Sequence, residues 1–447
     1  MIRLYTLTSD LHSEMMADAA AEPFVQGVET ALGERFCLRG ADFTDYGSAG
    51  ATDLIYVRTG GTEGLFKQVF CAEEPTPRIP GGAPVRLLTS DESNSLAASM
   101  EILSFLRLYG LPGEILHGSP AEIAARLQGS APCPSTTLHR PMGHNRVLAG
   151  QRYGVVGRPS DWLISSDVDY AKAAEVLGAE LIDIDIEELI SLWKDSAASG
   201  RGDSAEAELA EGSFRSAGRN SDASAAERLG LKPLNRPKFG RPIPEAEFEK
   251  VLRVYQCLHI LVDKYRLSGL TLRCFDLLTA IGTTGCLALS LLNSHQIVAT
   301  CEGDIPAMLT MAVARQAAGT PGFQVNLSKI TGDDLLFAHC TVPVDLVEDY
   351  CFDTHFESGI GVALHGEFRR GPFTLFKIGA RLDAFVAEDV LLTSNQYEDR
   401  LCRTQVHIQA PGLPAYLLNA PLGNHHILLP GHHAQALAAF VKFYEEL

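Results

Sequence analysis

The chain has 447 residues, of which 46% are hydrophobic, enough for two or three domains with large cores. It carries 37 basic and 55 acidic residues, which gives a formal net charge of −18. Such a chain repels the phosphates of nucleic acids and of anionic membranes, so neither is expected as a partner.

The cysteines and the hydropathy of the chain indicate the cellular compartment in which the protein is expected. The 10 cysteines contain no Cys-x-x-Cys pair, and Cys257, Cys274, Cys286 and Cys301 lie among apolar residues, as reduced, buried cysteines of cytosolic proteins do. The segment from Met1 lacks the basic and apolar regions of a signal peptide. No apolar run reaches the roughly 18 residues that a membrane span needs. We therefore predict a cytoplasmic protein.

Residues 1–145 alternate short apolar runs with amphipathic segments, which predicts a parallel sheet with helices on its faces. The expected strands are 2–7, 54–57, 85–88 and 113–116, and the expected helices are 97–109 and 120–127. A stretch rich in Ser, Pro and Thr, 129–140, leads to the next unit.

Residues 146–329 predict a second α/β domain of the same kind. The expected strands are 152–157, 181–184, 270–275, 296–300 and 322–325, and the expected helices are 245–265, 277–292 and 305–318. The segment 195–235 is dominated by Ser, Ala, Gly, Asp and Glu, which predicts an exposed, flexible insertion.

Residues 330–447 change in character, because strand-like runs follow one another without a long helix. The expected strands are 352–367, 373–378, 381–392 and 401–408, before a final helix at 432–446. The predicted fold class is thus α/β: two Rossmann-like parallel-sheet α/β domains, then an antiparallel β-rich, barrel-like C-terminal domain.

Two carboxylates, Glu302 and Asp304, stand between a predicted strand and a predicted helix. In open α/β sheets the chemistry lies at the carboxyl ends of strands. A carboxylate there can bind a divalent cation or act as a base. The alternative is local: Glu302 would complement the helix dipole, and Asp304 would cap the helix with Pro306 in its first turn.

This Glu-x-Asp segment and the Met- and Ala-rich helix after it resemble the metal-dependent aldose–ketose isomerases related to L-fucose isomerase and L-arabinose isomerase. The order of α/β and β-rich regions and the late Gly423-Asn424-His425-His426-Ile427 extend the resemblance over most of the chain. It implies a small-molecule sugar substrate, Mn²⁺ (or Mg²⁺) to polarise the substrate oxygens, and a carboxylate base. It also implies a homo-oligomer, trimer or hexamer, with active sites at subunit boundaries.

The resemblance assigns roles to particular positions. Glu302 would be both metal ligand and catalytic base, and Asp304 is a second catalytic candidate. The next ligand position, after the strand 322–325, holds Asn326 instead of a carboxylate. An amide oxygen can ligate a hard cation but brings no charge, so metal affinity or the reaction itself should differ from the family's.

Histidines complete the predicted site. His425 or His426 resembles the family's C-terminal metal ligand; neighbours on a strand point to opposite faces, so only one should reach the site, and we favour His425. His339 resembles an additional histidine of the arabinose isomerase branch, which would contact substrate or metal, or is a buried imidazole bonded to the backbone. His355 and Glu357 form a polar cluster that could bind substrate hydroxyls.

Arg58 and Ser90 lie in two loops that follow predicted strands, 58–64 and 89–95, and are candidate substrate-binding residues. Glycines and hydroxyls at such positions can hold a sugar or an anion through backbone N–H groups, or simply form turns and caps. A third such loop is 157–162. None matches a dinucleotide-binding or P-loop motif.

Three functions fit these patterns. The first is a metal-dependent isomerase of a small sugar that works through a cis-enediol. The second is another reaction on a sugar or sugar acid, such as hydrolysis or carbon–carbon cleavage, suggested by Asn326. The third is a sugar-binding protein without catalysis.

Overall fold

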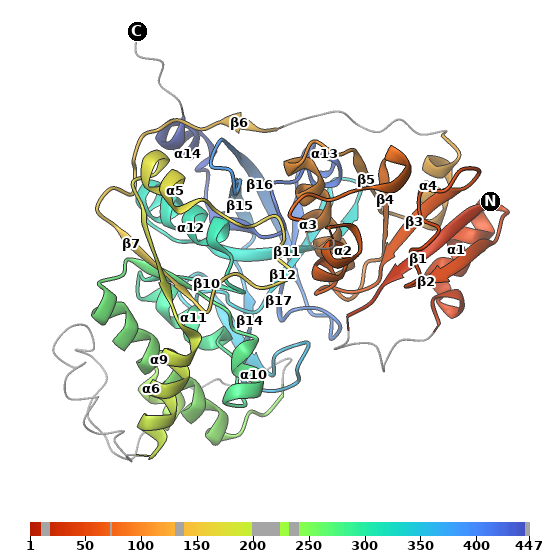
Figure 1. Ribbon diagram of the computed structural model, residues 1–447. Coiled ribbons are helices and arrows are strands. Elements are labelled where there is room, and N and C mark those ends of the chain that lie inside the picture. The colour runs from red at the N-terminus through yellow and green to blue at the C-terminus, as the bar shows by residue number, and fades with distance from the viewer. Residues whose placement is uncertain (10–17, 72–73, 130–137, 199–223, 232–240, 443–447) are drawn as a thin grey trace, which may run out of the picture.

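The computed structural model describes residues 1–9, 18–71, 74–129, 138–198, 224–231 and 241–442. Two parallel α/β sheets flank a closed antiparallel barrel (Figure 1). The predicted fold class is therefore confirmed, while the domain limits at residues 145 and 329 stay predictions.

The N-terminal sheet is parallel and has the strand order β2-β1-β3-β4-β5. Its strands are β1 (Ile2–Leu7), β2 (Phe36–Gly40), β3 (Thr52–Val57), β4 (Val85–Thr89) and β5 (Gly113–Leu116). Its helices are α1 (Pro23–Leu32), α2 (Glu63–Cys71), α3 (Ser95–Leu108) and α4 (Pro120–Leu127). The sequence had not predicted β2 and α1. Helix α3 is buried from Ser95 to Leu106 because it packs between this sheet and the barrel strand β11.

The central sheet is also parallel, with the order β10-β9-β7-β8. Its strands are β7 (Arg152–Val156), β8 (Glu180–Ile184), β9 (Gly269–Leu272) and β10 (Val298–Cys301). Its helices are α5 (Tyr170–Val176), α6 (Ile186–Ala198), α8 (Ala225–Arg228), α9 (Glu245–Tyr265), α10 (Asp276–Ala280), α11 (Cys286–Ser294) and α12 (Ile305–Ala318). The single helix predicted at 277–292 is wrong: the chain leaves the helix at Ile281, and Gly282 takes a φ of +63°.

Six antiparallel strands form the barrel in the order β15-β18-β11-β12-β17-β16, and the pairing of β15 with β16 closes it. The strands are β11 (Phe323–Thr331), β12 (Asp334–His339), β15 (Gly371–Ile378), β16 (Ala384–Gln396), β17 (Thr404–Gln409) and β18 (His426–Pro430). The short strand β6 (Arg140–Pro141) pairs with β16. A separate hairpin consists of β13 (Asp349–Asp353) and β14 (Ala363–Glu367). The last two helices are α13 (Leu413–Asn419) and α14 (Ala434–Val441).

Two strand predictions need correction. The segment 322–325 is not a strand of the central parallel sheet, because β11 pairs antiparallel with β12 and β18 in the barrel. Its first six residues are buried without alternation, a pattern that does not reveal strand direction. The strand predicted at 352–367 is instead the β13–β14 hairpin with a loop between its strands. Helix α13 was not predicted.

The predicted insertion 195–235 lies largely outside the described residues, but both of its described ends are ordered. Helix α6 continues to Ala198, and α8 packs on α9, with Leu229 and Leu231 buried behind it. The prediction of an exposed segment is therefore wrong at the second of these ends, where Leu229 and Leu231 are buried.

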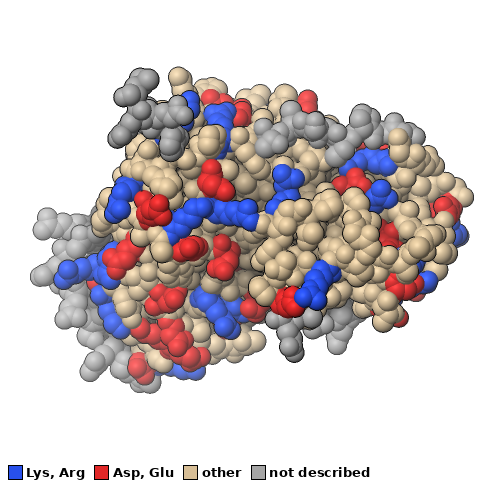
Figure 2. Space-filling model, turned by 45° about the horizontal axis from the view of Figure 1, so that its top comes forward, with Lys and Arg blue, Asp and Glu red and all other residues tan. Residues whose placement is uncertain are grey.

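The surface charges, the helices and the cysteines relate to the predictions made above about nucleic acid, membrane spans and disulfides. Acidic and basic side chains are interspersed over the face seen in Figure 2. Within the described residues, no helix is both long and apolar enough to cross a bilayer. The nine described cysteines are all free, and eight of them are buried.

Candidate metal centre

Glu302 stands at a tight turn between β10 and α12. Both Glu302 and Gly303 are left-handed, with φ of +67° and +71°. A Cβ on Gly303 would lie 2.5 Å from the carbonyl oxygen of Arg158, so only glycine allows this approach of the 158–159 segment. A glutamate with positive φ is uncommon, and such strain concentrates at functional sites.

The turn brings Glu302 against two histidines from the barrel. His339 is the last residue of β12, and His425 directly precedes β18. Their Nε2 atoms lie 3.8 Å and 3.5 Å from the Glu302 Oε1 atom, and the two imidazole rings meet edge to face at 5.3 Å. One ligand atom from each of the three residues lies within 4.8 Å of the others, as in a metal centre.

Hydrogen bonds on the far side of each ring set these orientations. The Nδ1 atom of His425 lies 2.8 Å from Oδ2 of Asp304, and that of His339 lies 2.9 Å from the Thr341 hydroxyl. These partners turn both Nε2 atoms toward Glu302. Metal-bound histidines are commonly oriented by such a hydrogen bond on the other ring nitrogen. On the other side, the indole N–H of Trp162 donates to Oε2 of Glu302 at 2.7 Å.

These residues fit a bound divalent cation. Separations of 3.5 Å and 3.8 Å are poor hydrogen bonds, but are close to the spacing of two ligands that each lie about 2.1 Å from one ion. Two buried polar atoms, Nε2 of His425 and Oδ1 of Asn326, have no hydrogen-bond partner among the described residues. A carboxylate, two imidazoles and an amide oxygen form a donor set suited to a divalent metal ion.

The protonation states of Glu302 and His425 depend on each other. Burial disfavours both charged forms, but each charge stabilises the other. The pKa of His425 is raised to about 10 because Glu302 and Asp304 outweigh its burial. The pKa of Glu302 lies well below its usual range because His425 and His339 outweigh its burial.

A small pocket of about 50 Å³ opens in front of Glu302, and all three sheet units contribute to its wall. Its polar lining comprises Glu63 and Asn94 from the N-terminal unit, Trp162 and Glu302 from the central unit, and Asn326, Glu357 and Asn424 from the barrel region. Asn94 Nδ2 donates to Glu357 Oε1 at 3.0 Å and so joins two of these units.

The structure brings together most of the predicted site residues. Asn326 and Glu357 line the pocket with Glu302, and His339, predicted to bind substrate, lies among the possible metal ligands. His355 is buried, and its ring meets that of Phe275, a residue of the pocket wall, edge to face at 5.5 Å. Asp304 is fully buried: Oδ1 accepts from the Ala307 N–H at 2.6 Å and Oδ2 meets His425. It caps the helix and orients the histidine, so it does not reach the pocket.

His426 faces away from Glu302. Its ring is fully buried, with Nε2 2.9 Å from the Tyr416 hydroxyl and Nδ1 2.9 Å from the Asn424 carbonyl oxygen. The structure thus places His425, and not its neighbour, at the site.

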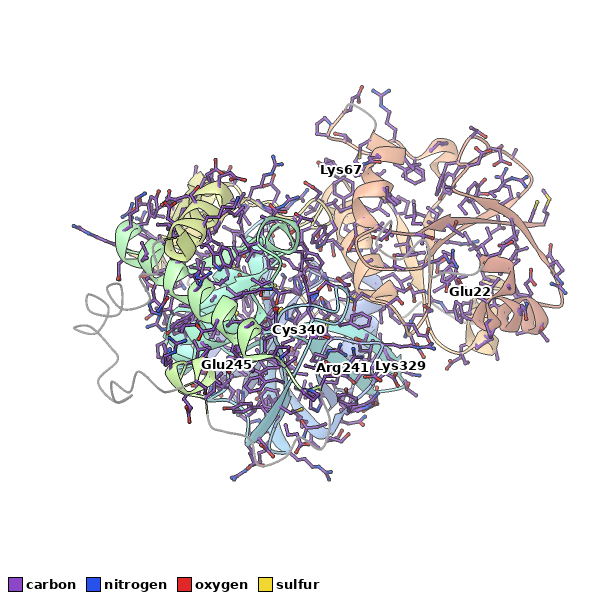
Figure 3. All side chains as sticks on the ribbon, turned by 90° about the horizontal axis from the view of Figure 1, so that it is seen from below. Glu22, Lys67, Arg241, Glu245, Lys329 and Cys340 are labelled. Atoms are coloured by element: carbon purple, nitrogen blue, oxygen red, sulfur yellow. The ribbon has the colours of Figure 1, made fainter. Side chains whose placement is uncertain are left out.

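Arg58 and Ser90 are not at this pocket. They line a separate cavity of about 1280 Å³ at the carboxyl ends of the N-terminal strands, where Glu22 and Lys329 lie on its two sides (Figure 3). Arg58 is ion-paired with Glu22 there. Neither residue lines the small pocket at Glu302, and their role in binding substrate stays a prediction.

Sequence reasoning missed several residues. Trp162 lies in the third loop noted above, but nothing in that loop pointed to Glu302. Glu63 lay in a loop singled out for Arg58, its glycines and its hydroxyls, and was not itself named as a candidate. Glu101, on α3, is fully buried and accepts hydrogen bonds from the Ser165 and Asn424 N–H groups and the Ser166 hydroxyl. A carboxylate inside a helical apolar pattern gives no sequence signal for such long-range partners.

Two curated proteins are similar to parts of this chain. A protein named sulfoquinovose isomerase from Alkalicoccus urumqiensis is 23% identical over 294 residues, which cover 64% of this chain and 59% of that protein. Another sulfoquinovose isomerase, from Clostridium sp. (strain MSTE9), is 26% identical over 155 residues, which cover 31% of this chain and 33% of that protein. The chain thus spans less than two thirds of the curated relatives that it matches. No family model matches the chain.

The chain combines two parallel α/β sheets, a closed barrel and a Glu-His-His cluster beside the end of a parallel strand, and both relatives are named as isomerases of a sugar. At 23% and 26% identity, this similarity supports a place for the chain at the level of the fucose isomerase/arabinose isomerase-like superfamily.

Proposed function

We propose that the chain is a metal-dependent aldose–ketose isomerase of a small sugar, working through a cis-enediol. The observation that carries the proposal is the grouping of Glu302, His339 and His425, with ligand atoms mutually within 4.8 Å, beside a pocket that Glu302 lines. The names of the two relatives support isomerisation of a sugar, and they make sulfoquinovose the first substrate to test.

Each residue has a task in this reaction. Glu302, His339 and His425 would hold Mn²⁺ or Mg²⁺, with the Asn326 amide oxygen as a further donor; the ion supplies polarisation of the substrate oxygens. Glu302 would move the proton between C2 and C1 as a general base. Asp304 and Thr341 would keep the two imidazoles in the ligating tautomer. We also retain the predictions of a cytoplasmic homo-oligomer.

The second candidate is a different reaction on a sugar, and Asn326 favours it because the family's second carboxylate is missing. Products that do not form an aldose–ketose pair would support that candidate. A non-catalytic sugar-binding role would show as tight binding that survives both chelation and Glu302→Gln.

The experiment combines metal analysis with hydrogen exchange. The purified protein, incubated with Mn²⁺, should hold about one ion per chain and exchange the C2 hydrogen of sulfoquinovose or another aldose with solvent deuterium. Glu302→Gln and His339→Ala should lose ion and exchange together. His432→Ala, a histidine whose side chain is 68% exposed, is the matched control and should keep both. No ion and no exchange in the unmodified protein would refute the proposal.

A further inference from the structure

Asn326 leaves the proposed reaction one proton-transferring group short. In an aldose-to-ketose conversion, Glu302 takes the C2 proton, the C2–H electron pair forms the C1=C2 double bond, and the C1=O1 π pair moves onto O1. O1 must then gain a proton, and O2 must lose one, while C1 receives the proton that Glu302 holds. An amide neither gives nor takes protons at neutral pH, so Asn326 cannot serve the two oxygens.

Two further carboxyl groups line the same pocket, Glu63 and Glu357. The pocket holds only about 50 Å³, room for roughly four waters at the usual 10–15 Å³ each. Only the C1–C2 end of a sugar fits within it. Any group on its wall therefore lies close to the reacting oxygens once that end is bound.

The position of Glu357 differs from that of Glu63. Glu357 lies in the loop between β13 and β14 and lines both the small pocket and the large cavity beside it. A substrate that extends from the large cavity to Glu302 would pass this side chain. Glu63, by contrast, is only 2% exposed and its Oε2 atom has no hydrogen-bond partner among the described residues.

We propose that Glu357 carries the hydroxyl proton in this isomerisation, giving a proton to O1 and taking one from O2, in place of the carboxylate missing at position 326. This proposal rests on the proposed isomerase function. The step balances, because Glu357 ends in the protonation state in which it began and no external acid, base or oxidant is consumed.

The electrostatics of the pocket support this choice. Burial and the charge of Glu302 raise the pKa of Glu357 to about 7, against the hydrogen bond from Asn94, so both of its forms are accessible near neutral pH. Burial raises the pKa of Glu63 well above its usual range, with Glu101 and Glu302 adding to the effect. Position therefore favours Glu357, which lies where the pocket meets the large cavity, over Glu63, which lines the small pocket alone.

The test uses an isosteric variant and a rescue. Glu357→Gln keeps an oxygen that can accept from Asn94, but it cannot carry a proton. We expect kcat for isomerisation to fall by about 10²–10⁴-fold, with manganese content and circular dichroism unchanged. The double variant Glu357→Gln/Asn326→Asp should have a kcat at least tenfold higher than that of Glu357→Gln alone, because it returns a carboxylate to the family's position.

Other outcomes overturn the assignment. Activity of Glu357→Gln within about threefold of the unmodified chain would do so, as would a loss that Asn326→Asp does not reduce. If Glu63→Gln lowers kcat and Asn326→Asp restores it, while Glu357→Gln leaves kcat unchanged, the proton-carrying role belongs to Glu63. If the unmodified, manganese-loaded chain converts no sugar at all, the proposed function itself fails, which separates that result from a failure confined to Glu357.

Discussion

Asp304 and His425 share a 2.8 Å hydrogen bond between two fully buried side chains, although they lie on different structural units. The same carboxylate caps helix α12 through its other oxygen. One residue therefore fixes both the start of the helix behind Glu302 and the ring that faces Glu302. The local interpretation of Asp304 as an N-cap is confirmed, and its link to His425 adds a role in positioning a possible metal ligand.

Asp304→Asn should separate these two roles. The asparagine oxygen can still accept from the Ala307 N–H, so the cap survives, whereas its NH₂ group opposes an N–H on Nδ1 of His425. We expect Mn²⁺ affinity, measured by calorimetry, to fall by about 10–100-fold, with a change in melting temperature of only a few degrees. Unchanged affinity would mean that the hydrogen bond does not orient the histidine.

Metal binding should depend steeply on pH. In the metal-free chain His425 stays protonated up to its raised pKa of about 10, and an ion can ligate only the neutral ring. Apparent Mn²⁺ affinity should therefore rise about tenfold per pH unit between pH 6.5 and 8.5, with about one proton released per ion. Calorimetry in two buffers of different ionisation enthalpy measures both quantities, and a flat profile would contradict the prediction.

The same raised pKa stabilises the metal-free fold. For a histidine whose pKa is raised by folding, the stabilisation is complete below its ordinary pKa near 6.5 and is lost as the pH rises toward 10. The melting temperature of the metal-free protein should fall across that window. His425→Ala removes the titrating group, so it should show a flatter profile and serves as the control.

Trp162 should report on the metal centre by fluorescence. The chain has two tryptophans, and the Trp162 indole donates to Glu302 whereas the ring of Trp193 stacks with Arg253. Adding Mn²⁺ changes the charge beside the Trp162 indole, so Trp193→Phe should keep the metal-dependent signal and Trp162→Phe should lose it. The reverse result would place the ion away from Glu302.

Glu101 should matter for stability, because it joins α3 to two segments of the other units. Glu101→Ala leaves three donors, on Ser165, Ser166 and Asn424, without their acceptor, and the free energy of unfolding should fall by about 3 kcal/mol or more. Denaturant unfolding measures this loss. Glu348→Ala removes an exposed ion pair with Arg369 and should cost less than about 1 kcal/mol, so equal losses would contradict the prediction.

Local patterns in the sequence determined much of this protein. The bounds of β1, α4 and α9 were predicted to the residue, because apolar spacing and terminal residues set them within a few turns of chain. The place of Glu302 after a parallel strand followed in the same way, as did the two α/β units and the antiparallel C-terminal region. The resemblance to sugar isomerases rested on these same local features.

Only the tertiary structure decided which distant residues meet. The barrel is closed by the pairing of β15 with β16, and β11 pairs within the barrel and not with the central sheet. Both results depend on long-range backbone pairing, which a continuously buried strand does not specify. The family resemblance had assigned His425 to the Glu302 site, but the geometry of that meeting, and the addition of Glu63 and Asn94 from the N-terminal unit, depend on how the three units pack. Such packing is a sum of many weak contacts over the whole chain, so no short motif encodes it.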